Sequence, residues 1–166
     1  MTAALDTPPP PDSLLARFAQ ERSAFADAYT LQLPRPVSLA EFVEAFYTTR
    51  AFWPERALLA LFGKTSSAAT ARAVARGEGD RFAVWTVQAR EGDELLMHED
   101  TGATRSWFKA VPGHGGTTLW FGSAVVPRRR GADGEPRFSA VFHALLGFHR
   151  HHSRLLLGAA GRRLQR

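Results

Sequence analysis

The chain has 166 residues, of which 45% are hydrophobic and 22% are charged, a composition typical of one globular domain rather than a disordered chain. It contains no cysteine, which excludes disulfide bonds, thiolate metal sites and cysteine nucleophiles. Neither a signal-peptide pattern nor an apolar run of about 18 residues is visible, so we expect no membrane span and a bacterial-type cytoplasmic location.

The formal net charge is +5, and residues 127–166 hold nine arginines against two acidic residues. Such a segment is typical either of a solvated helix face or of a basic surface that binds anionic lipid or nucleic acid. Nucleic-acid surfaces usually interleave aromatic and basic side chains in the open, whereas the aromatic residues here belong to an apolar stripe. We therefore favour the solvated face, do not expect nucleic acid as a partner, and keep a basic surface module at Arg128, Arg129 and Arg130 as an alternative.

The first half of the chain predicts a short tail, a strand and several helices. Residues 1–12 contain four consecutive prolines and are predicted to be a disordered tail ahead of a single domain over 13–166. Ser13 is predicted to cap a helix over 13–22, and alternating residues over 27–33 predict a strand. Ser38 and Glu41 have the spacing of a capping box, which predicts the start of a helix. Further helices are expected over 53–63 and 66–76.

The second half is rich in strand-forming residues and ends in a long amphipathic segment. Four strands are expected over 81–90, 94–99, 104–111 and 117–126, joined by glycine-containing turns into an antiparallel meander, which makes five strands in all. A polar loop is expected over 127–136, followed by one helix over 138–164. Positions 138, 142, 145, 149, 152, 156 and 159 share one face of this helix, and Phe148 and Leu155 widen the apolar stripe.

This order of elements predicts an α+β fold, with a curved antiparallel sheet wrapped around the long C-terminal helix and extra helices after the first strand. The last helix, about 40 Å long at ~1.5 Å per residue, is the element expected to cover the sheet. A twisted sheet that wraps one helix leaves room between the two, which is typical of an apolar binding cavity.

Several residue strings resemble those of a known family. They are Phe82-Ala-Val-Trp85, Arg105-Ser-Trp107, Leu119-Trp-Phe-Gly-Ser-Ala-Val-Val126, Phe148-His-Arg150 and Ser153-Arg-Leu-Leu-Leu157. Together with the element order over residues 25–164, they are similar to a bacterial branch of the START-like (SRPBCC) helix-grip superfamily, which includes polyketide cyclases and lipid-binding proteins. No reaction is assigned to that branch, so the resemblance implies a fold and a cavity, and no particular activity.

Candidate cavity residues come from the strands and from the helix. Ser106 and Ser123 are predicted to share inner strand faces with apolar residues, as ligand hydrogen-bond donors or as hydroxyls satisfied by backbone. Trp85 and Trp107 form an aromatic wall or ordinary core, and because Ser106 and Trp107 are adjacent, only one can face the cavity in a regular strand. The predicted ligand-binding set is Trp85, Ser106, Trp107, Phe121, Ser123, Phe142, Leu145, His149 and His152.

His149 and His152 are the candidate acid–base groups, because they lie three residues apart on the apolar face of the helix. No acidic residue stands at metal-motif spacing beside them, so we expect no metal and no cofactor, and packed core histidines are the favoured alternative. The leading hypothesis is the binding of a hydrophobic or aromatic small molecule. The alternatives are a cyclase- or hydrolase-like enzyme that uses a cavity histidine, and the basic surface module; a homodimer is left open.

Overall fold

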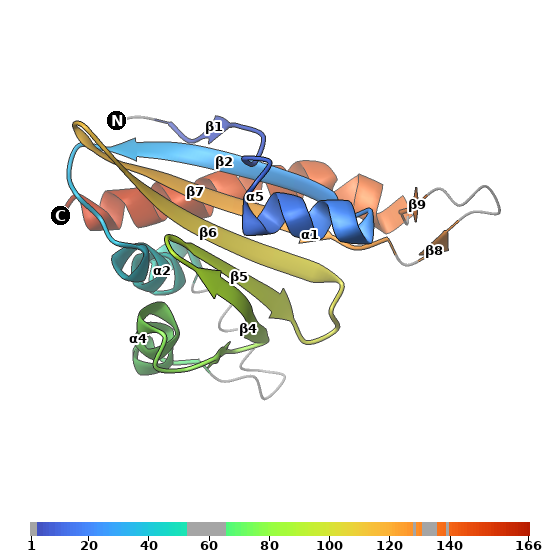
Figure 1. Ribbon diagram of the computed structural model, residues 1–166, viewed down its shortest axis with the longest axis horizontal. Coiled ribbons are helices and arrows are strands. Elements are labelled where there is room, and N and C mark those ends of the chain that lie inside the picture. Colours follow the sequence, from blue (N-terminus) through green and yellow to red (C-terminus); the bar gives the residue numbers. More distant parts are fainter. Residues whose placement is uncertain (1–2, 53–65, 128, 131–135, 139) are drawn as a thin grey trace.

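Seven strands form a single open antiparallel sheet in the computed structural model, which describes residues 3–52, 66–127, 129–130, 136–138 and 140–166 (Figure 1). The order across the sheet is β1-β2-β7-β6-β5-β4-β3. The strands are β1 (Leu5–Asp6), β2 (Phe25–Leu33), β3 (Arg81–Phe82), β4 (Trp85–Glu91), β5 (Glu94–Glu99), β6 (Thr104–Gly113) and β7 (Gly116–Val125). The central pairing of β2 with β7 joins the start of the chain to the end of the meander.

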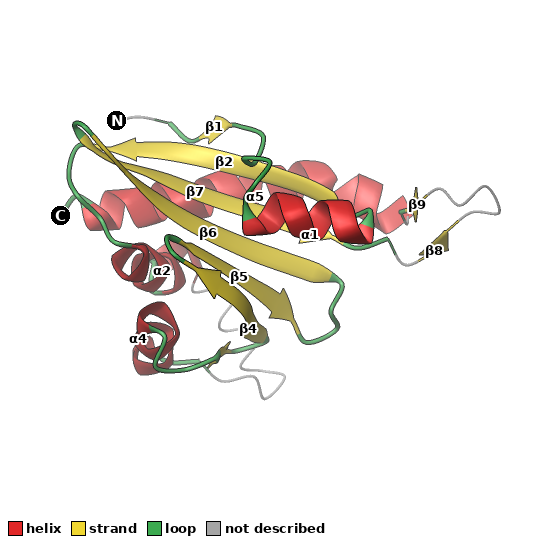
Figure 2. Ribbon diagram, in the orientation of Figure 1, coloured by secondary structure: helices red, strands yellow, loops and turns green. Residues whose placement is uncertain are grey.

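The described helices lie on both faces of this sheet. They are α1 (Leu14–Arg22), α2 (Leu39–Tyr47), the 3-10 helix η1 (Arg50–Phe52), α4 (Ala68–Arg76) and α5 (Ala140–Leu164). Figure 2 shows α1 in front of the sheet and α5 behind it. The helix expected over 53–63 lies outside the described residues. The segment expected as a loop over 127–136 contains two short paired strands, β8 (Arg129–Arg130) and β9 (Pro136–Arg137).

The predicted helix starts are confirmed by their capping contacts. The side chain of Ser13 accepts a hydrogen bond from the amide of Ala16 and caps α1. Ser38 and Glu41 form the reciprocal capping box that their spacing predicts, and this contact fixes the start of α2. These local contacts satisfy backbone donors that a helix start leaves unpaired.

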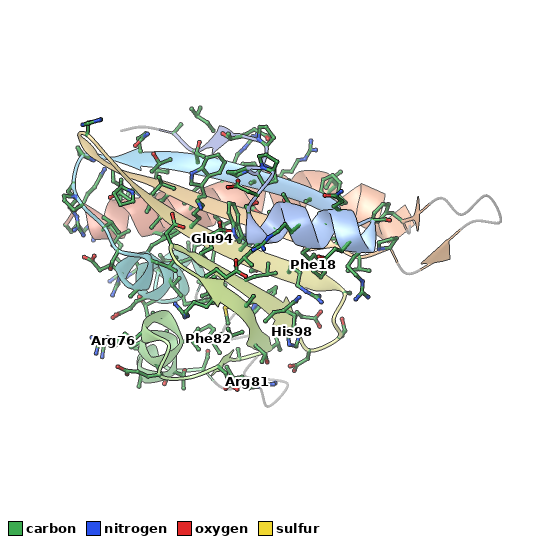
Figure 3. All side chains as sticks on the ribbon, viewed as in Figure 1. Phe18, Arg76, Arg81, Phe82, Glu94 and His98 are labelled. Atoms are coloured by element: carbon green, nitrogen blue, oxygen red, sulfur yellow. The ribbon has the colours of Figure 1, made fainter. Side chains whose placement is uncertain are left out.

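The sheet has two apolar faces, each with its own core. The larger core packs inward-facing residues of the strands against α2, α4 and α5, and Figure 3 shows its member Phe82 beside α4. The smaller core packs α1, through Leu15 and Phe18, against Ala28, Trp107 and neighbouring residues on the opposite face. Both faces are therefore covered, whereas the sequence analysis assigned a cover to only one.

Several expectations about the ends of the sheet need correction. Leu5 and Asp6, placed in the expected disordered tail, form an edge strand that pairs with Tyr29 and Thr30. The strand expected over 81–90 is divided into β3 and β4, because Ala83 adopts a left-handed backbone conformation (φ 54°). The two-residue strands β1 and β3 raise the number of strands in the sheet from the expected five to seven.

The buried face of α5 is rotated relative to the predicted one. Ser153, Leu156, Leu157 and Ala160 are buried, but Phe148, expected in the apolar stripe, is 67% exposed, and Leu155 is also exposed. The ring of Phe148 stacks instead on His152, with centroids 5.7 Å apart. The fold is α+β, with the C-terminal helix packed on the sheet, and no helix within the described ranges is long and apolar enough to cross a membrane.

Candidate functional site

A cavity of about 220 Å³ lies between the sheet and α5. Its apolar wall consists of aromatic rings from α2, η1, β4 and β7, namely Phe46, Tyr47, Phe52, Trp85 and Phe121. The rings pack against one another, with the centroids of Phe46 and Phe121 4.5 Å apart. A wider depression of about 750 Å³ at the turn between β6 and β7 is open to solvent and is formed largely by turn residues and glycines. The cavity against α5 is more enclosed and more apolar, and it is therefore the better candidate site.

Polar side chains reach the cavity from β6, β7 and α5. Ser106 and Ser123 are cross-strand partners on the inner face of the sheet. His149, His152 and Ser153 reach the same cavity from α5. Two strands and one helix thus bring hydroxyl and imidazole groups together beside the aromatic wall.

Most of the predicted ligand-binding residues meet at this cavity. Its lining includes Trp85, Ser106, Phe121, Ser123, His149 and His152. Phe142 and Leu145 belong to α5, but their side chains lie outside the described part of the structure. Trp107 was expected in the cavity, and this was wrong because its side chain belongs to the core under α1.

The position of Trp107 is explained by a buried carboxylate on the same face. Its indole Nε1 donates to Glu94 Oε2 at 2.7 Å, and that oxygen also accepts from the amide of Leu14 at 2.8 Å. Lys109 donates to the other carboxylate oxygen at 2.8 Å. Figure 3 shows Glu94 and Phe18 where α1 crosses the sheet. Trp107 therefore anchors α1, and the adjacent Ser106 is the residue that faces the cavity.

A chain of hydrogen bonds connects the cavity to a buried carboxylate on β2. Asp27, only 7% exposed, accepts a bond of 2.6 Å from the hydroxyl of Ser123 and one of 2.9 Å from the hydroxyl of Tyr29. The oxygen of Ser123 lies 2.7 Å from Nε2 of His149. Nε2 of His149 is itself 3.6 Å from Oδ1 of Asp27. Asp27 was not among the predicted site residues. It lies on the same strand face as Tyr29 and Leu31, so it was a charged residue at an inward position.

The pKa of the Asp27 carboxyl is lowered from its ordinary value. Burial acts to raise this pKa, but the nearby His149 and the hydrogen bonds from Ser123 and Tyr29 outweigh burial. The pKa of the Tyr29 phenol is raised by burial and by the adjacent Asp27 carboxylate. Asp27 is therefore a carboxylate at neutral pH, and Tyr29 is a neutral hydrogen-bond donor.

These ionisation states assign the proton between Ser123 and His149. Ser123 has one hydroxyl proton, and a carboxylate oxygen 2.6 Å away can only accept it. The contact with His149 then requires a proton on Nε2 of the imidazole, donated to the Ser123 oxygen. In a hydrolytic triad the histidine instead accepts the serine proton. This arrangement therefore does not activate Ser123 as a nucleophile.

Two further hydroxyls in the cavity wall have no protein partner. Ser106 is 7% exposed and Ser153 is 3% exposed, and both line the cavity. Within the described part of the chain, neither hydroxyl forms a hydrogen bond with another protein group. The two residues are mostly buried, but their unpaired hydroxyl oxygens keep some accessible surface at the cavity, so they are available to a molecule bound there. Ser153 was not among the predicted site residues, although it follows His149 by four positions, the spacing of neighbours on one helix face.

A separate group of charged side chains, around Arg81, Asp100 and Arg105, makes structural contacts. Arg81 forms a two-pronged ion pair with Asp100, and Arg105 binds Gln88 and the carbonyl of Gly102. The guanidinium of Arg105 also lies 4.4 Å from the centre of the Phe18 ring, on the face away from the cavity. Within the described ranges, no group of three or more acidic or imidazole side chains is placed to hold a metal ion.

Comparison with known proteins does not assign this chain to a family. No protein-family model matches the sequence, and no curated protein matches it.

Proposed function

We propose that this protein binds a small, mainly aromatic molecule in the cavity between the sheet and α5, as a cytoplasmic helix-grip protein of the START-like kind. The observation that carries the proposal is the pair of hydroxyls of Ser106 and Ser153, which lack protein partners among the described residues and line a cavity with a wall of aromatic rings. A binding site for a small molecule typically has this composition, an apolar surface with a few convergent polar groups.

The size of the cavity limits the ligand. An apolar cavity of about 150 Å³ holds benzene, so a space of about 220 Å³ fits a molecule with one ring or two fused rings. Polyketides and lipids of several rings or long chains need more room, since pockets for drug-sized molecules start near ~300 Å³. The proposed ligand is therefore a compact aromatic compound with one or two polar substituents that the serine hydroxyls bind.

The proposal is tested by titrating the full chain with phenol, indole, nitrobenzene and naphthalene, with binding measured by calorimetry and by thermal shift. Ser106→Leu fills the cavity from β6 and is expected to abolish binding while the chain stays folded. Thr118→Leu is the matched control, because Thr118 lies on the half-exposed outer face of β7, where its hydroxyl binds Gln32. Binding by Thr118→Leu and not by Ser106→Leu locates the ligand in the cavity.

Two results would contradict the proposal. The first is that no probe binds the wild-type chain. The second is that Ser106→Leu, shown by circular dichroism to be folded, binds the probes as tightly as the wild type. The hydrolase alternative receives no support from Ser123, whose proton is committed to Asp27.

A further inference from the structure

We infer that His149 accepts a proton from an aromatic ligand that carries an acidic hydroxyl, with Ser123 and Asp27 as its positioning residues. This inference rests on the proposed function, because it names the class of ligand, phenols, and the group that deprotonates them. The geometry that carries it is the chain from Asp27 through Ser123 to a histidine that lines the cavity.

The free nitrogen of His149 is the acceptor. Nε2 is engaged by the Ser123 oxygen and carries a proton, as argued above. Nδ1 then holds a lone pair in the neutral imidazole, and within the described residues it has no hydrogen-bond partner. The side chain of His149 is 38% exposed, so protons can exchange with solvent. The imidazole is thus fixed at one nitrogen and available at the other.

A carboxylate lies beside the nitrogen of His149 that already carries a proton. The Asp27 Oδ1 oxygen is 3.6 Å from Nε2, so it is close to the positive charge that proton transfer to Nδ1 would create. Two other charged groups have partners outside the cavity, since Arg154 lies over the Tyr29 ring and pairs with Asp6, and the guanidinium of Arg105 is on the outer face. His152 lines the same cavity as His149, and its ring stacks on Phe148. Arg150 is exposed and acts through its charge on Tyr29.

The proton balance of the step is simple. The phenol O–H bond breaks, its electron pair stays on the oxygen, and the proton forms an N–H bond at Nδ1 of His149. The products are a phenolate and an imidazolium, held as an ion pair beside Asp27. The Ser106 and Ser153 hydroxyls are available as donors to the phenolate oxygen, which accepts hydrogen bonds more strongly than the neutral phenol does.

The experiment uses para-nitrophenol, which is yellow only as the phenolate, so its absorbance reports its protonation in the bound state. With the wild-type chain, we expect the ionisation midpoint of the bound probe to fall by about one pH unit or more relative to the free probe, because an imidazolium faces it. In His149→Gln the midpoint is expected to rise above that of the free probe, since an apolar cavity disfavours the anion. Asp27→Asn is expected to give an intermediate midpoint.

His151→Gln is the matched control, because His151 is exposed on the same helix, and it should keep the wild-type midpoint. Nitrobenzene, which cannot ionise, verifies that each variant still binds. If the wild type binds nitrobenzene and nitrophenol but leaves the ionisation midpoint unchanged or raised, the inference is wrong and the proposed cavity function stands. An equal midpoint in His149→Gln and wild type, or loss of the effect in His152→Gln alone, also overturns it. If neither probe binds, the proposed function fails as well.

Discussion

Asp27 offers the most direct test of the hydrogen-bond chain that supports His149. Its carboxylate accepts from Ser123 and Tyr29 while being almost completely buried. Asp27→Ala removes both acceptors and leaves two buried hydroxyl donors without partners. Asp27→Asn keeps one carbonyl oxygen as an acceptor but removes the negative charge.

The cost of each substitution follows from the bonds that it breaks. A hydrogen bond to a charged group contributes about 1.5–3 kcal/mol, so losing the two bonds in Asp27→Ala should lower the free energy of unfolding by about 3–6 kcal/mol. Domains are typically stable by only about 5–15 kcal/mol, so this variant should be close to its limit of stability. Asp27→Asn should lose less, about 2–4 kcal/mol, because one neutral hydrogen bond worth about 1 kcal/mol survives.

Urea denaturation as a function of pH isolates the contribution of the Asp27 charge to the free energy of unfolding. The pKa of Asp27 is lower in the folded chain than its ordinary value of 3.8. The unfolded chain therefore binds this proton more readily, and the stabilisation is fully present above the ordinary value and is lost as the pH falls through the folded pKa. The difference in stability between wild type and Asp27→Asn should stay constant down to about pH 5 and shrink between pH ~5 and pH ~2. A difference that stays constant or widens over that range would refute the assignment of Asp27 as a stabilised carboxylate.

Three further predictions concern the elements that position the cavity. Glu94→Ala should lower the free energy of unfolding by about 3–5 kcal/mol, because it removes the acceptor of three donors. Glu94→Gln keeps a carbonyl oxygen and should lower the free energy of unfolding clearly less. Equal losses for the two variants in urea titrations would contradict this account. Gly122→Ala should cost about 1–3 kcal/mol by overpacking, because its new Cβ would lie 2.6 Å from a methyl of Leu15 and 2.8 Å from the carbonyl oxygen of Asp27; an unchanged midpoint of thermal unfolding would contradict it. Ser38→Ala should cost about 1 kcal/mol by loss of the α2 cap, measured in the same assay, and a loss near zero would mean that the capping box adds nothing.

Local structure was predictable wherever neighbouring residues determine it. Ser13 and Ser38 were identified as caps because a helix start needs a side-chain acceptor within three residues, and both contacts are present. The strands from β4 to β7 follow from glycine-containing turns that join runs of strand-forming residues. Such features depend on sequence separations of a few residues, so the chain itself carries the information.

The long-range pairing of the sheet could not be predicted in the same way. The strand β2 pairs with β7, about ninety positions further along the chain, and no local pattern encodes that choice. The edge strand β1 has two residues, so alternation cannot reveal it. Helix α1 was recognised but was not assigned to a face, and Trp107 was consequently placed on the wrong side of the sheet. Arg105 and Lys109 lie two positions before and after Trp107, on the same face of β6. These polar neighbours were the signal that the face of Trp107 differs from the face of Ser106.

The candidate site was predictable as a set of faces but not as a network. Strand parity places Ser106 and Ser123 on the inner face, and helical spacing places His149 beside them, as the structure has it. The bond from Ser123 to Asp27 depends on the β2–β7 register, in which these two residues are direct partners. An aspartate at an inward position of a strand is unusual, and it was the sequence signal for Asp27, the member of the network that was not predicted.

The sizes of the side chains that face α5 explain why an open space survives near His149. Toward the C-terminal end of the helix, Gly161 lets the backbone approach β2 so closely that an added Cβ would lie 2.2 Å from a methyl of Leu31. Leu156, Leu157, Ala160 and Leu164 complete the packing there. Toward His149, the facing positions are the small residues Ser123, Ser106 and Ser153, which cannot fill the volume that leucines would occupy. The chain thus uses apolar bulk at one end of the helix to hold the helix in place, and small hydroxyl side chains at the other end to keep the cavity open and polar beside His149.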